Sequence, residues 1–156
     1  GGTYLSSGMS CMKGDKLFVD TNILVYSYDI SAGEKHTAAK DVLNELWDTG
    51  NGLVSTQVLQ EFFVTVTRKI SKPMDVAVAK EIVKDLLTWK VITVNGSLIL
   101  DAIELQQKYV YSFWDSLIIA SGIHGGASTI LSEDLSDKQK IKGVLIKNPF
   151  SALSKR

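Results

Sequence analysis

The chain has 156 residues, of which 45% are hydrophobic and 22% are charged, and its 17 basic and 17 acidic residues give a formal net charge of zero. This composition is typical of one soluble globular domain and argues against intrinsic disorder and against a strong, sequence-independent affinity for nucleic acid. The single cysteine, Cys11, excludes an internal disulfide. No apolar run approaches the roughly 20 residues of a membrane span, so we expect a cytoplasmic protein that does not contact a membrane.

The beginning of the chain differs in composition from the rest. Residues 1–15 are polar and glycine-rich, without the charged flank and apolar block of a signal peptide, and we interpret them as a flexible leader or a cloning remnant. Residues 16–150 show no linker, repeat or low-complexity block and are predicted to form one domain. Residues 151–156 are then a C-terminal tail.

Short apolar runs alternate with amphipathic segments along the domain. The apolar runs predict strands, and the segments with apolar residues at helical spacing predict helices. This alternation predicts a three-layer α/β/α sandwich around a central parallel sheet of four or five strands. In chain order the predicted elements are a strand at 16–20, a helix at 36–50, a strand at 52–56, helices at 56–70 and 73–89, a strand at 90–94, helices at 97–110 and 113–123, and strands at 128–131 and 143–150.

The helix at 113–123 contains one charge, Asp115, in a segment that is apolar almost all the way round. A charge in such a setting is costly unless a hydrogen bond, an ion pair or a metal compensates it. The neighbouring Trp114 could stack on unpaired RNA bases, but we expect it to pack in the core. A helix that is apolar on every side therefore carries an acid that needs a partner.

Three further acids are predicted to lie near Asp115. Asp20 follows the first strand and Asp134 follows the strand at 128–131, so both belong to the carboxyl edge of the sheet, where functional groups gather in parallel sheets. Right-handed crossovers place the start of the helix at 113–123 at the same edge. Glu61 lies within two turns of this edge, on the helix that follows the second strand.

Each of these acids has an ordinary structural interpretation when it is taken alone. Asp20 and Asp134 would be turn or cap residues, Asp115 a first-turn acid facing the helix dipole, and Glu61 a solvated residue near Arg68. Four acids at one edge would nevertheless repel one another if nothing bound them. Oxygen ligands of this kind are preferred by Mg²⁺ and Mn²⁺, so the combination points to a divalent metal site.

A family resemblance rests on four segments of the sequence. They are FVDTNILVY, QVLQEF, FWDSLIIAS, and ILSEDL together with the later GVLIKNPF. In this order and at these intervals they resemble the PIN-domain nucleases, and most of all the VapC-type toxins of toxin–antitoxin pairs and their free-standing relatives. The resemblance covers about residues 16–150. It implies a PIN-like fold and a metal-dependent endoribonuclease that uses Mg²⁺ or Mn²⁺, with RNA as substrate and an antitoxin protein and a second copy of the chain as candidate partners.

The resemblance also assigns roles to individual residues. The catalytic acids would be Asp20, Glu61, Asp115 and Asp134, with Asp20, Asp115 and Asp134 as metal ligands. Thr21, Asn22 and Ser132 match the supporting positions, and Glu133 and Asp137 are reserve acids for the fourth position. Lys16, Arg68 and Lys69 are candidate substrate contacts.

Two other functions are compatible with parts of the pattern. One is a non-catalytic PIN-fold module that binds RNA or a protein partner, although the chain retains all four acids. The other is a phosphatase of the haloacid dehalogenase kind, whose nucleophilic aspartate also ends the first strand. That chemistry needs a second aspartate two residues further on, where this chain has Asn22.

Overall fold

The structure is a computed structural model that describes residues 14–153. Most of the predicted leader, residues 1–13, and the end of the predicted tail, residues 154–156, lie outside the described residues. The strands are β1 (Leu17–Val19), β2 (Gly52–Ser55), β3 (Lys90–Ile92), β4 (Thr129–Leu131), β5 (Lys140–Ile141) and β6 (Val144–Lys147). The helices are α2 (Thr21–Tyr26), α3 (Glu34–Thr49), α4 (Thr56–Arg68), α5 (Val76–Leu86), α6 (Gly96–Lys108) and α7 (Phe113–His124), with a 3₁₀ turn, η1 (Ile30–Ala32).

The strands form one six-stranded sheet in the order β3-β2-β1-β4-β6-β5. Every neighbouring pair is parallel except β5 with β6, which is antiparallel. The predicted α/β architecture is therefore confirmed, and the five predicted strands are the five parallel ones. The sixth strand, β5, has only two residues, Lys140 and Ile141, which is too short to give an alternating pattern in the sequence.

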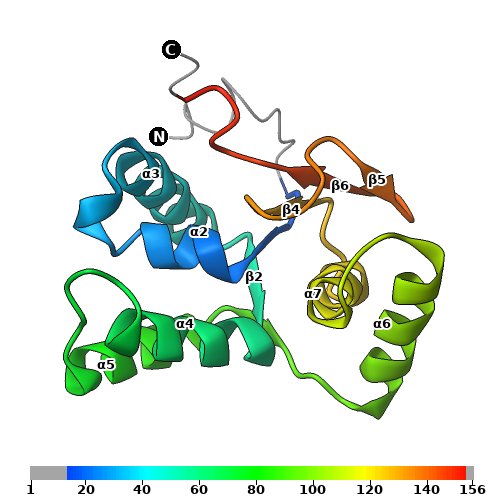
Figure 1. The fold of residues 1–156 in the computed structure, drawn as a ribbon, viewed down its shortest axis with the longest axis horizontal. Helices are drawn as coiled ribbons and strands as arrows, with labels where there is room; N and C mark the ends of the chain where they lie inside the picture. Colours follow the sequence, from blue (N-terminus) through cyan, green and yellow to red (C-terminus); the bar gives the residue numbers. More distant parts are fainter. Residues whose placement is uncertain (1–13, 154–156) are drawn as a thin grey trace.

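Helices cover both faces of the sheet, as Figure 1 shows, with α2 to α5 on one side and α6 and α7 on the other. On the first side α3 and α4 contact β2, and on the second α7 contacts β2 and β4. Helix α7 lies very close to the sheet at Gly122, where an added Cβ atom would come within 2.7 Å of Ile130. Because α7 is enclosed by the sheet and by α6, its segment from Ser116 to Gly122 is buried. No helix among residues 14–153 is long and apolar enough to cross a membrane.

One helix was not predicted. Helix α2 begins directly after β1, and the side chain of Asp20 caps it by accepting a hydrogen bond from the backbone N–H of Thr21. Its six residues are mostly β-branched or aliphatic and continue the apolar run of β1, so helical periodicity cannot be recognised in it. The cap is nevertheless important for the site, because it turns the chain immediately after the strand.

The order of the strands creates a crevice at the centre of the sheet. From β1 the chain proceeds to β2 and β3 on one side, whereas β4 and β6 lie on the other side of β1. The connections leaving β1 and β4 therefore diverge at the carboxyl edge, which is where ligands bind in open parallel sheets. Asp20 follows β1 and Ser132 follows β4, so both lie at this point.

Candidate active site

Asp20 is the most buried of the acids, with 6% of its surface exposed. The register pairs Val19 with Leu131, and the next residues along the two strands, Asp20 and Ser132, are joined by a hydrogen bond. Ser132 Oγ donates to Asp20 Oδ2 at 2.7 Å, and the backbone N–H of Thr21 donates to Asp20 Oδ1 at 2.7 Å. Each carboxylate oxygen therefore has a donor, which fixes the plane of the carboxyl group.

Asn22 connects the turns that follow β1 and β4. Its amide nitrogen donates to Asp134 Oδ2 at 3.0 Å and lies 3.5 Å from Asp20 Oδ2, while its amide oxygen accepts from the backbone N–H of Glu133 at 3.2 Å. The backbone N–H of Asp134 donates to Ser132 Oγ at 3.2 Å. Asp134 itself is exposed. These contacts hold an exposed carboxylate beside a buried one.

Glu61 projects from α4 toward the same crevice. Thr21 Oγ1 donates to Glu61 Oε2 and Gln57 Nε2 donates to Glu61 Oε1, both at 2.8 Å. Glu61 forms no ion pair with Arg68 in the described part of the chain, so the interpretation as a solvated helix residue is wrong. The carboxylate is instead oriented through both of its oxygens.

Gln57 was missed in the sequence. Its side chain is buried, and its amide nitrogen donates to the backbone carbonyl of Trp114 at 3.3 Å as well as to Glu61, so it ties α4 to the start of α7. Its amide oxygen is buried without a hydrogen-bond partner. The spacing of four residues between Gln57 and Glu61 was the available signal, because residues at i and i+4 share one face of a helix.

Asp115 lies in the first turn of α7, where Ser112 Oγ caps the helix by accepting from the Asp115 backbone N–H at 3.1 Å. The cap places the side chain at the open end of the helix, before the buried segment begins. The expectation that Trp114 packs in the core is wrong, because 63% of its surface is exposed. The first turn of α7 projects beyond the sheet edge, so its second residue has no neighbouring layer to cover it.

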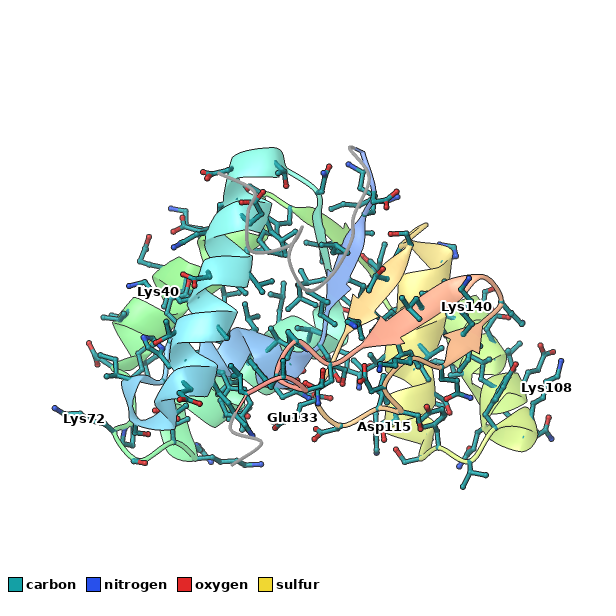
Figure 2. The ribbon with its side chains drawn as sticks, turned by 90° about the horizontal axis from the view of Figure 1, so that it is seen from above. Lys40, Lys72, Lys108, Asp115, Glu133 and Lys140 are labelled. Carbon is teal, nitrogen blue, oxygen red and sulfur yellow. The ribbon has the colours of Figure 1, made fainter. Side chains whose placement is uncertain are left out.

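A single cavity of about 500 Å³ brings the predicted acids together. Figure 2 shows Asp115 at this edge of the molecule, with Lys72 and Lys108 on opposite flanks. The cavity also includes Asp29, which caps η1, and among its described lining residues Lys69 is the one cation. Its lining residues include the four predicted acids Asp20, Glu61, Asp115 and Asp134, with Thr21, Asn22, Gln57, Thr65, Lys69 and Trp114.

Burial, together with the neighbouring negative charges, raises the pKa of two of these groups. Burial raises the pKa of Asp20 to about 6; hydrogen bonds from Ser132 and Thr21 oppose this rise, and the charges of Glu61 and Asp134 add to it. Partial burial also raises the pKa of Asp115, against the hydrogen bond at Ser112, and the charges of Asp134 and Glu61 raise it further. The four carboxylates therefore repel one another across the cavity.

The ligand types at this cavity suit a hard divalent cation, because they are carboxylate, hydroxyl and amide oxygens. None of the four acids forms an ion pair within residues 14–153, so their charge is uncompensated by the protein itself. In the same part of the chain no group of three or more His, Cys, Asp or Glu is arranged so that it could hold a metal ion. A cation in the cavity would therefore need water or substrate oxygens among its ligands.

The two reserve acids are engaged elsewhere. Glu133 Oε1 accepts from Tyr26 Oη at 2.7 Å, and Glu133 Oε2 forms an ion pair with Lys35, whose ammonium lies 5.3 Å from the centroid of the Tyr26 ring. Asp137 Oδ1 accepts from the backbone N–H of Asn148 at 2.8 Å. Neither acid lines the cavity as the structure describes it, whereas Asp134 does.

Replacing Glu133 by alanine is expected to lower the free energy of unfolding by about 1–2 kcal/mol, because the Tyr26 hydroxyl loses its acceptor and Lys35 its ion pair. Glu133→Gln should lose less, because an amide oxygen still accepts from Tyr26. Urea denaturation measures both changes, with Glu104→Ala, at an exposed position on α6, as the control. An equal stability of Glu133→Ala and Glu104→Ala would contradict this anchoring role.

Comparison with known families gives one match that covers most of the chain. Residues 17–139 match the family described as the PIN domain. None of the curated proteins matches the chain.

Several solved structures have a similar fold. The chain is similar to VapC20 from Mycobacterium tuberculosis, a Sarcin-Ricin loop cleaving toxin, with a TM-score of 0.58 and 23% identity over 74% of this chain and 87% of that chain. It is also similar to a toxin–antitoxin complex from Klebsiella pneumoniae, with a TM-score of 0.63 and 21% identity over 86% of this chain and 98% of that chain. DNA-bound VapBC from Salmonella typhimurium gives a TM-score of 0.61 with 13% identity over 86% of this chain and 98% of that chain. At these identities the likeness shows a shared fold.

Proposed function

The chain belongs to the PIN domain family, and from this premise we propose that it is a divalent-metal-dependent endoribonuclease that hydrolyses phosphodiester bonds of RNA. The observation that carries the proposal is the single cavity lined by Asp20, Glu61, Asp115 and Asp134. These acids come from four separate elements and lack ion-pair partners among the described residues. An RNA phosphate is repelled by such a cavity unless a cation lies between them.

Each acid has a role that follows from its surroundings. Asp20, Asp115 and Asp134 would supply the carboxylate ligands of the ion, and water and substrate oxygens would complete its coordination. Asp20 is fixed in the crevice by Ser132 and Thr21. Asp134 is exposed, so an entering substrate would reach it before the buried Asp20. A bound Mg²⁺ or Mn²⁺ would activate a water molecule and stabilise the negative charge that develops on the phosphate.

Glu61 is the residue best placed to act on the attacking water. Its two oxygens are already oriented by Thr21 and Gln57, and each retains a further lone pair for a water molecule. We assign it the acceptance of a proton as the water adds to phosphorus and a backbone P–O bond breaks. Thr21 and Gln57 would then position the base rather than contact the substrate.

The neighbouring structures suggest the biological setting. One is described as a Sarcin-Ricin loop cleaving toxin, and others as toxin–antitoxin complexes, two of them with DNA. They support a toxin role for this chain, with an antitoxin protein as partner; a homodimer remains a proposal from the family resemblance. Expression of the wild-type chain in bacteria should arrest growth, and the Asp20→Asn variant should not.

The decisive experiment is a cleavage assay on purified protein. Single-stranded and hairpin RNAs are incubated with Mg²⁺, with Mn²⁺ or with EDTA, and the products are separated by length. We expect internal cleavage with either metal, none with EDTA, and none with Asp20→Asn. The control is Asp101→Asn, which removes an exposed acid from α6 outside the cavity and should cleave like the wild type.

The same assay discriminates the alternatives. Tight RNA or partner binding without cleavage, in both the wild type and Asp20→Asn, would favour a non-catalytic module. Release of phosphate from small phosphate esters would favour a phosphatase. The phosphatase alternative has the weaker support, because Asn22 donates its amide to Asp134 and lacks the carboxyl group that such an enzyme needs.

A further inference from the structure

Trp114 is a large aromatic side chain placed on the wall of the acidic cavity, directly before Asp115. With 63% of its surface exposed, it contributes little of the burial that usually justifies a tryptophan. The other two tryptophans behave differently. Trp47 and Trp89 pack against each other with ring centroids 5.2 Å apart, and neither lines this cavity as the structure describes it.

The position of Trp114 is fixed although its ring is uncovered. Its backbone carbonyl accepts from the buried amide of Gln57 at 3.3 Å, and its ring contacts that of Phe113 with centroids 5.2 Å apart and planes inclined by 71°. Phe113 in turn packs against the core. The indole is thus held at the cavity by its backbone and by one edge contact, and much of its surface remains free for another molecule.

The chemistry of the cavity indicates what that molecule is. The wall of the cavity combines carboxylates with apolar side chains, Val25, Ile70 and Ile118 as well as Trp114. A nucleotide suits such a mixed wall, because it would place its phosphate at the proposed cation site and its base over the indole. Stacking on an aromatic ring requires a base that is not already stacked within a duplex. Lys69 lies on the same cavity and is available for a second phosphate.

We propose that Trp114 stacks on an unpaired base next to the scissile phosphate and so contributes to the binding of the RNA. This inference rests on the proposed nuclease function and adds a substrate-binding residue to it. It explains why the first turn of α7 presents an acid and an aromatic side by side. In this arrangement Asp115 would act on a bound cation, and the Trp114 ring would contact the nucleotide beside it.

Binding and cleavage must be measured separately to test this. In a Trp47→Phe, Trp89→Phe background Trp114 is the single tryptophan, since the chain has three. With Ca²⁺ as the cation, a short single-stranded RNA should quench its fluorescence, and a blunt duplex of the same sequence should not. Trp114→Ala should raise the Kd for the single strand, measured by fluorescence anisotropy, by about 5- to 100-fold, and Trp114→Phe by less than the alanine variant.

The control is Leu100→Ala, which removes another exposed apolar side chain, 64% exposed on α6, and should leave the Kd unchanged. An abasic nucleotide at the stacked position should weaken binding of the wild type and leave that of Trp114→Ala unaffected. Unchanged RNA binding by Trp114→Ala would overturn the inference. The inference would also be overturned if Trp114→Ala lost binding to a protein partner but kept its affinity for RNA. If the RNA stacks on Trp114 but is not cleaved, the inference is supported and the nuclease function is refuted. If Trp114→Ala cleaves RNA normally and binds it with an unchanged Kd, the nuclease function is supported and the inference is refuted.

Discussion

Changing Asp134 to asparagine is expected to lower the rate constant of metal-activated RNA cleavage by more than about 100-fold, because it would remove a charged ligand from the proposed cation site. Asp134 lines the cavity and is held beside Asp20 through the amide of Asn22. Its loss should also raise the Mg²⁺ concentration needed for half-maximal activity. Both quantities come from one titration of initial rate against Mg²⁺.

The neighbouring acids are the matched controls for this prediction. Asp137→Asn should keep the wild-type rate within about threefold, because Asp137 binds the backbone of Asn148 outside the cavity. Glu133→Gln should behave similarly, because the Glu133 carboxylate accepts a hydrogen bond from Tyr26 and forms an ion pair with Lys35. If Asp137→Asn removes activity and Asp134→Asn does not, the fourth acid is Asp137.

Replacing Asp20 by asparagine is expected to stabilise the metal-free protein at pH 7.5 while it abolishes cleavage. Burial raises the pKa of Asp20 from 3.8 to about 6. The ionised side chain therefore opposes folding at neutral pH by roughly 3 kcal/mol. Asparagine still accepts from Thr21 and donates to Ser132, without the charge. The gain should appear as an increase in Tm of roughly 6–12 °C in EDTA.

The pH dependence of this difference follows from proton linkage. Between pH 3.8 and about pH 6 the folded protein retains a proton on Asp20 that the unfolded chain has already lost. The contribution of Asp20 to stability therefore falls as the pH rises through this interval, and above it the loss is complete. The wild type and Asp20→Asn should thus have similar stability near pH 3.5 and diverge progressively up to pH 7.

A divalent cation should reverse the order at neutral pH. Under the proposed metal site, it would bind the ionised Asp20 of the folded wild type and stabilise the protein by mass action, whereas the asparagine variant would bind the cation weakly. Thermal unfolding of both proteins with and without Mg²⁺, at pH 7.5 and pH 3.5, tests the expected effects of the substitution, of pH and of the cation. A wild type more stable than Asp20→Asn in EDTA at pH 7.5 would show that burial of this carboxylate is not costly.

Much of this arrangement was predictable, because the family motifs and the alternation of apolar runs with amphipathic segments are local features of the sequence. The family and the α/β architecture were correctly predicted. The grouping of Asp20, Asp115 and Asp134 followed from a rule about the carboxyl edge of parallel sheets, which needs only the order of the elements. Their assignment as metal ligands stays a prediction.

The interactions that orient the acids were not predictable. The pairing of Glu133 with Tyr26 and Lys35 joins residues far apart in the chain, so no spacing of residues in the sequence predicts it. Trp114 was placed in the core because an aromatic next to an apolar helical segment is usually buried. Its exposure depends on how far the first turn of α7 projects beyond the sheet, which is a property of the assembled layers.

The hydrogen bond between Ser132 and Asp20 joins residues that are 112 positions apart in the chain. Closing so long a loop is entropically unfavourable until the intervening strands and helices have folded, so we expect this pairing to form late in folding. A chain still under synthesis therefore possesses no reactive centre until β4 has been made and docked beside β1. Under the proposed ribonuclease function, such a delay would protect the ribosome-bound message from its own incomplete product.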